Sequence, residues 1–194
     1  MTTALLVAMT ITATPGLLQF TMRVHDYVET HRRLAATIEQ PLCSEAEELT
    51  RQADALAAAI RDARPRAKEG DIFTFAAGEA LRARIAAMVR RSNVDVAGFL
   101  ARYGSEREEL EVHVFGALPW RTHVALMPII RELPDLPPEL EYRFAGRHLV
   151  LMDVGAKMVV DVLRDALPLP IEAPVPVAPY TPCAAHPELD ACWM

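Results

Sequence analysis

The sequence lacks both a surplus of basic residues and a recognisable catalytic or cofactor motif. Its 194 residues include 20 Lys and Arg against 26 Asp and Glu, which gives a net charge of −6 at pH 7. Nucleic-acid binding normally needs a basic surface, so we expect no nucleic-acid partner. The chain has no G-x-S-x-G elbow, no glycine-rich phosphate loop and no H-E-x-x-H pair. These absences do not exclude an enzyme whose site is assembled in space, but we predict neither a cofactor nor a metal ion.

The N-terminal segment lacks charge altogether. Residues 2–20 contain no charged side chain, and Ala4 to Ile11 form an apolar block of the size typical of a signal peptide. No basic residue precedes this block, and Pro15-Gly16 interrupts the apolar stretch that a membrane-spanning helix would need. Three interpretations of residues 1–21 therefore stay open: a signal peptide, a retained membrane tether, and a buried N-terminal helix or strand.

Cysteine is scarce, and two of the three cysteines, Cys183 and Cys192, lie in the C-terminal tail. A disulfide between them would close a small loop and would persist only in an oxidising compartment. The alternatives are free thiols and a metal site with His186, although the spacing fits no standard zinc pattern. Together with the N-terminal block, the predicted disulfide favours a periplasmic or secreted protein. We interpret Cys43 as a small apolar residue that is at least partly buried.

Two helices are expected in the first third of the chain. Apolar residues recur at helical spacing from Met22 to about Ile38, and Gln40-Pro41 ends that helix. The second helix begins with a predicted capping box, in which Ser44 is the N-cap and Glu47 its partner, and ends before Pro65. Because a short loop joins them, we expect the two helices to form an antiparallel hairpin.

Two more helices are expected before residue 105. One begins after the turn at Gly70–Thr74. Asp95 is suited to cap a short fourth helix, which Gly104 would close. Residues 106–115 mix charged residues with alternating valines and are predicted as strand or loop.

The hydrophobic period changes from helical to alternating after Glu139. Three short strands separated by tight turns are expected, at residues 139–144, 148–154 and 158–163. The second is apolar on both faces, so it should be central and covered by the helices. We therefore predict one α+β domain over residues 22–167, with about four helices and a small antiparallel meander. Residues 168–194 are predicted to form an extended proline-rich tail.

Three polar residues are candidates for a functional site: His31, Asp153 and Asp161. The two aspartates flank the last predicted hairpin, and a loop centred on Lys157 would set them opposite each other on one sheet face. A two-residue loop at Gly155-Ala156 would not. Such a carboxylate pair could perform acid–base chemistry or bind a hard cation, but strand-end aspartates more often bond turn amides. His31 is expected to pack against the second helix and to bond a backbone carbonyl.

Three segments near the C-terminus share a recognisable pattern: Glu139 to Arg147, Leu149 to Val154, and Val159 to Pro168. They resemble the carboxy-terminal signature of a group of uncharacterised, predicted-secreted bacterial proteins, and the resemblance extends over roughly Arg23 to Pro168. It implies export, because members commonly carry a signal peptide. It implies no activity and no catalytic residue. This chain departs from the signature at His148 and Gly155, which weakens the case for a site in the meander turn.

Three functions are compatible with these observations. The first, which we expect, is an exported accessory protein that binds a protein or envelope component through its helical face or its proline-rich tail. The second is an enzyme of unknown reaction, with hydrolysis as the expected class and with a pocket between helices and meander. The third is a subunit tethered to a membrane complex through residues 2–20. A deep pocket with converging polar groups would favour the enzyme, and a flat surface the accessory protein.

Overall fold

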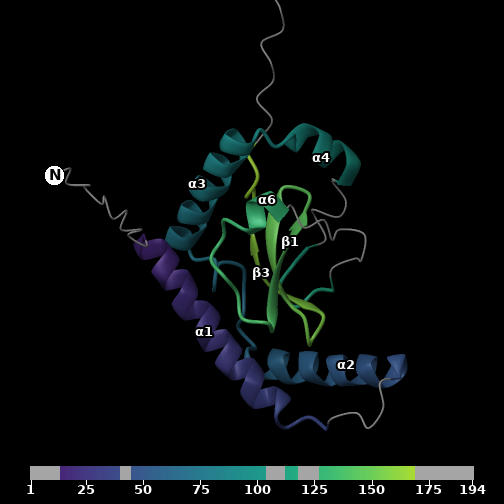
Figure 1. Ribbon diagram of the computed structural model, residues 1–194. Coiled ribbons are helices and arrows are strands. Elements are labelled where there is room, and N and C mark those ends of the chain that lie inside the picture. The colour runs from purple at the N-terminus through teal and green to yellow at the C-terminus, as the bar shows by residue number, and fades with distance from the viewer. Residues whose placement is uncertain (1–13, 40–44, 104–111, 118–126, 169–194) are drawn as a thin grey trace, which may run out of the picture.

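The structure is a computed structural model and describes residues 14–39, 45–103, 112–117 and 127–168. Helices come first along the chain and strands last (Figure 1). The elements are α1 (Pro15–Ala35), α2 (Ala46–Ala63), α3 (Phe75–Ser92), α4 (Val96–Tyr103), α6 (Met127–Ile130), β1 (Leu140–Ala145), β2 (His148–Asp153) and β3 (Met158–Leu163). The predicted α+β fold, with its helical first part and C-terminal three-stranded antiparallel sheet, is confirmed.

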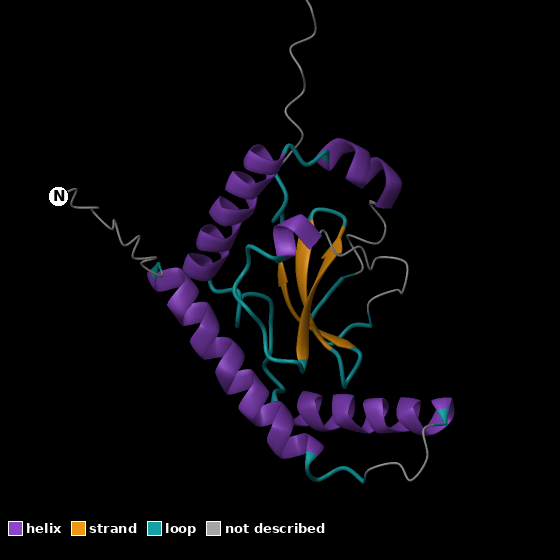
Figure 2. Cartoon of the chain, in the orientation of Figure 1, coloured by secondary structure: helices purple, strands orange, loops and turns teal. Residues whose placement is uncertain are grey.

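The sheet is a meander in which β2 lies between β1 and β3 (Figure 2). Ala145 pairs with His148, so the turn between β1 and β2 is the predicted two-residue turn. Gly146 in that turn has φ 54°, a left-handed conformation that glycine adopts without strain. Every residue of β2 is buried, in agreement with its apolar sequence and its predicted central position.

The sheet is covered on both faces. One face joins α1, α2 and α3 in the main core. The other carries a smaller apolar cluster made by Val112, Ala145, Val150, Met152, Val159 and Val162. Residues 112–117 lie along β3, because Phe115 donates its N–H to the carbonyl of Val159, and Val159 donates to that of Gly116, each at 2.9 Å. The described end of the segment predicted as strand or loop is thus a loop bonded to the sheet.

Helix α1 begins at Pro15, well before the predicted start at Met22. Proline suits the first helical position because its missing N–H would have no partner there, so Pro15 starts the helix rather than interrupting an apolar segment. Phe20 is fully buried in the main core. Residues 15–21, which lie before the predicted domain start at residue 22, are thus part of this helix.

The N-terminal half of α1 is held by aromatic stacking and by a close helix contact. The Phe20 ring stacks on Phe73 at 5.6 Å and on Tyr142 at 6.3 Å between ring centroids. A Cβ atom at Gly16 would lie 2.2 Å from the carbonyl oxygen of Ala76, so only glycine allows this approach. Contacts between α1 and α3 are more extensive than those between α1 and α2.

The helix starts agree only partly with the sequence. Glu45 occupies the N-cap of α2 and makes no side-chain cap bond, so the helix begins later than a capping box at Ser44 requires. Thr74 caps α3 by accepting the Ala77 N–H. Asp95 caps α4 as predicted, since its carboxylate accepts the Gly98 N–H at 2.8 Å.

Several predictions fall outside the described residues. They concern Cys43, the closing role of Gly104, the N-terminal segment up to residue 13, and the proline-rich tail beyond Pro168 with Cys183 and Cys192. Their predicted roles stay predictions. Among the helices that the structure describes, none has the length and apolar character needed to cross a bilayer.

Candidate functional site

Asp153, at the end of β2, is the centre of a buried polar cluster. Its side chain is 0% exposed, and it accepts three hydrogen bonds. The Tyr27 hydroxyl donates to Oδ2 at 2.7 Å, and His31 Nδ1 donates to the same oxygen at 2.6 Å. The backbone N–H of Ala156 donates to Oδ1 at 2.7 Å. Helix α1 is thereby fastened to the turn between β2 and β3.

Local structure explains why these groups meet. Tyr27 and His31 are four residues apart on α1, so both side chains project from the same helix face. Asp153 ends β2, and its bond to Ala156 closes the turn that follows, as strand-end aspartates commonly do. Lys157 completes that turn with φ 51°.

Electrostatics favour a charged histidine opposite the carboxylate. The hydrogen bond to Asp153 raises the pKa of His31 above its usual 6.5, although burial acts in the opposite direction. Burial, followed by the nearby Asp153 charge, raises the pKa of Tyr27, which keeps its hydroxyl protonated as a donor. Below the folded-state pKa of His31, the cluster is therefore a buried ion pair with a phenol on the shared oxygen.

The cluster is largely buried. A Cβ atom at Gly155 would lie 3.2 Å from His31 Cε1 and 3.3 Å from Leu56 Cδ2, so turn, ring and α2 pack against one another. The His31 side chain is 9% exposed. The sequence interpretation expected His31 to bond a backbone carbonyl, and this is wrong because α1 directs the ring toward Asp153 instead.

Asp161, the third predicted site residue, has a different task. Its carboxylate accepts backbone N–H groups from Gly70 at 2.9 Å and from Ile72, Phe73 and Val162 at 2.7 Å each. Burial raises the pKa of this carboxyl, and the four N–H donors act against that rise. Asp161 thus anchors the loop before α3 to the sheet, which matches the structural interpretation of strand aspartates.

The two aspartates do not form a pair. Asp153 pairs with Met158, and a register shift between β2 and β3 at Leu151 and Met152 then places Asp161 opposite Leu151. The pairing of Asp153 with Met158 is that of a turn centred on Gly155-Ala156, the alternative that was not expected to set the two aspartates opposite each other. Each carboxylate is bound by its own set of donors, so the structure supports no two-carboxylate site.

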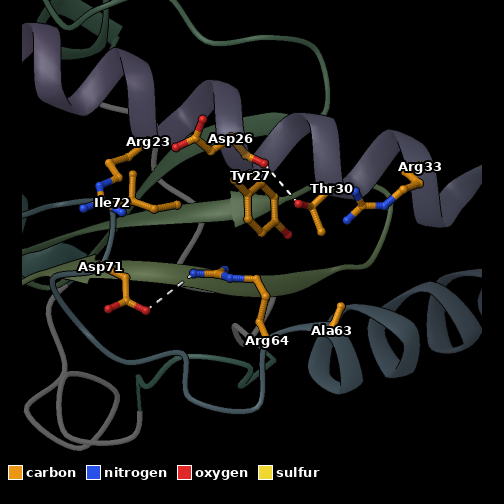
Figure 3. Close-up of a pocket in the computed structure, with 9 residues that line it drawn as sticks. All are labelled: Arg23, Asp26, Tyr27, Thr30, Arg33, Ala63, Arg64, Asp71 and Ile72. Carbon is orange, nitrogen blue, oxygen red and sulfur yellow. Dashed lines mark hydrogen bonds and ion pairs between the residues drawn. The ribbon is translucent and has the colours of Figure 1, made fainter.

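A polar cleft lies beside the Asp153 cluster, between α1 and the connection from α2 to α3 (Figure 3). Its volume is about 360 Å³. One wall comes from a single face of α1, with Arg23, Asp26, Tyr27, Thr30 and Arg33. The opposite wall consists of Ala63, Arg64, Asp71 and Ile72. We call this feature the arginine cleft, after Arg23, Arg33 and Arg64.

Arg64 crosses the floor of the arginine cleft. Figure 3 shows its side chain beneath Tyr27 and directed toward Asp71. Its guanidinium carbon lies 5.1 Å from the centre of the Tyr27 ring, a cation–π distance. The Arg64 Nη2 atom is 3.6 Å from Asp71 Oδ2, which is an ion pair rather than a hydrogen bond. Arg64 Nη1 is buried and has no hydrogen-bond partner among the described residues.

Sequence reasoning missed the arginine cleft. A signal was present, because Arg23, Tyr27, Thr30 and Arg33 follow helical spacing and share one face of α1. Arg64 gave no such signal, since only the tertiary fold brings the end of α2 to this face.

Comparisons with known proteins add no relative. No protein-family model matches the chain, and no curated protein or solved structure is significantly similar to it. The resemblance to predicted-secreted bacterial proteins therefore stays an expectation from the sequence. Within the described ranges, no group of three His, Cys, Asp or Glu side chains is placed to hold a metal ion.

Proposed function

We propose that the protein is an exported accessory protein that binds a partner through the arginine cleft and catalyses no reaction itself. The observation that carries this proposal is the separation of the cleft from the acid–base groups. His31, Asp153 and Asp161 do not line the cleft. The hydroxyl of Tyr27, which does line it, donates to Asp153. The open polar surface therefore offers groups that bind, and the groups that could transfer protons are closed off.

An enzyme is the second candidate, and one observation favours it. A histidine bonded through Nδ1 to a buried carboxylate is the arrangement that orients a general base. A base must also reach the proton it removes. The packing of Gly155 and Leu56 against the His31 ring argues against such access in this structure. We therefore assign the pair a structural role.

Export is supported by the sequence before α1. The apolar, uncharged residues 2–13 precede Pro15, and the main core begins at Phe20. Removal of a leader before Pro15 would leave every residue of that core in place. The three alternatives for the segment thus narrow, in this proposal, to a leader that ends before the folded domain.

Site-specific photo-cross-linking in the producing cells tests the binding role. A photoreactive side chain replaces Thr30, which lines the cleft, and in a matched control it replaces Ala55, which is exposed on α2. Intact-mass analysis of the purified protein then reports any covalent adduct. We expect a defined adduct at position 30 that is absent at position 55 and is lost when Arg23 and Arg33 are both changed to Gln.

Two results would contradict the proposal. One is an adduct at position 55 with none at position 30, which would move the functional surface to α2. The other is release of a processed product from an envelope substrate by the wild-type chain but not by a His31→Gln variant, which would favour the enzyme.

A further inference from the structure

We infer that the arginine cleft binds the carboxylate group of a small organic monoanion. This inference rests on the proposed function, because it assigns a ligand chemistry to the same cleft.

Arg64 has more donor capacity than its neighbours use. A guanidinium carries five N–H donors in a planar fork that matches the two oxygens of a carboxylate. The Arg64 side chain is 19% exposed, so water can satisfy few of these donors. Its partners among the described residues are one carboxylate oxygen at 3.6 Å and the face of the Tyr27 ring. Stacking on Tyr27 fixes the plane of the fork, which lowers the entropic cost of ligand binding.

Arg23 and Arg33 add positive charge from α1. Both are exposed and line the cleft from the helix face opposite Arg64. Neither has an ion pair with another residue in the described part of the chain. An anion held between the two walls would offset the repulsion among three cations, whereas a neutral ligand would not.

The charge balance of the cleft selects the class of anion. Three arginines against two aspartates leave one positive charge in excess. Asp71 is already occupied, since its Oδ2 accepts the Lys68 N–H at 3.1 Å and faces Arg64. Asp26 also lines the cleft, and its charge would repel a second negative charge on the ligand. A monoanionic carboxylate therefore suits the cleft better than a phosphate, which carries nearly two charges at neutral pH.

The size of the cleft suits a small molecule. A volume of about 360 Å³ lies at the lower end of the range for small-molecule pockets. A second cavity of about 290 Å³, beside α6 and β1, has Asp135 and Glu141 but no basic side chain in its lining. Of these two cavities, the arginine cleft is thus the one whose charges favour an anion.

Titration with defined anions tests the inference. The full chain is titrated with sodium benzoate, a monocarboxylate, and separately with inorganic phosphate, and backbone amide shifts are followed by NMR at constant ionic strength. We expect saturable shifts with benzoate in residues 23–33 and 63–72, and weaker binding of phosphate. Arg33→Gln and Arg23→Gln should each weaken benzoate binding about tenfold, the loss of one charge-assisted hydrogen bond.

Arg51→Gln is the matched control, because it removes the same charge from an exposed helix position outside the cleft. We expect it to leave benzoate binding unchanged. Thermal melts establish that each variant is folded. We expect this because positions 23, 33 and 51 are exposed. No saturable shift with benzoate, tighter binding of phosphate, or an equal loss in Arg51→Gln would each overturn the inference. A cleft adduct in the cross-linking experiment without benzoate binding would reject only the carboxylate and leave the binding role standing.

Discussion

At the scale of single residues, Asp153 shows how burial decides what a polar group can do. The residue could have served in catalysis had it lain in an open cleft. At 0% exposure, its carboxylate is instead satisfied by Tyr27, His31 and a turn N–H. Such a group connects two elements, and its removal leaves donors buried without an acceptor.

The stability lost on replacement of Asp153 by Asn measures how strongly this side chain connects α1 to the turn after β2. The amide has one acceptor oxygen for three donors and removes the charge that faces His31, so we expect unfolding to become easier by about 3 kcal/mol. Urea denaturation gives the value. Asp165→Asn, which changes a largely exposed aspartate paired with Arg147, should cost much less. A melting temperature that rises with a divalent cation in the wild type, but not in Asp153→Asn, would indicate a metal site instead.

The His31–Asp153 pair also predicts a dependence of stability on pH. Because the folded-state pKa of His31 is raised, its contribution is fully present below the unfolded pKa of about 6.5 and is lost as pH rises through the folded pKa. The stability difference between wild type and His31→Gln should therefore shrink at alkaline pH. His25→Gln, at an exposed position on the same helix, is the control. A difference that grows with pH would contradict the assignment of the pair.

At the scale of elements, local sequence patterns predicted the strands. The start of α1 and the bond between His31 and Asp153 depend on tertiary contacts. The strand bounds followed from alternation and from the turn at Gly146, both of which are local. The start of α1 was missed because a proline can either break a helix or occupy its first position. Only the burial of Phe20 distinguishes these two interpretations of Pro15. The link between His31 and Asp153 joins residues 122 positions apart, which no local pattern encodes.

Gly16→Ala tests the contact between α1 and α3. Helix propensity alone predicts that alanine stabilises α1 by up to about 1 kcal/mol. The new Cβ, however, would lie 2.2 Å from a backbone oxygen of Ala76, and neither backbone can move without disturbing the core. We expect destabilisation of about 1–3 kcal/mol in a denaturant titration. The sign of the change in the free energy of unfolding is decisive. A stabilised variant would show that α1 and α3 do not approach as closely as described.

At the scale of the whole molecule, a folded domain follows a predicted leader. The domain reaches from Pro15 to Pro168 in its described parts, and the leader would lie before it. We expect cell fractionation to find the protein outside the cytoplasm and N-terminal sequencing to find a mature start at or before Pro15. A mature start beyond Phe20 would remove a core residue and contradict the described fold.

The cleft shows what a single sequence cannot supply. Arg23 and Arg33 could be placed on one helix face by counting, but α1 alone does not make a cleft. The second wall comes from Arg64 and Asp71, whose position depends on how Asp161 holds the loop before α3. The site is a product of packing between elements, so it appears only when the fold is known.

Hydrogen–deuterium exchange across the whole chain tests the central claim, that the arginine cleft is the functional surface, most directly. The purified protein is compared with and without an envelope extract from the producing cells, with the Arg23→Gln/Arg33→Gln double variant as the matched control. We predict slower exchange in the extract at residues 23–33 and 63–72 of the wild type, and no change in the double variant. Slower exchange confined to other segments, or equal protection in the double variant, would contradict the account.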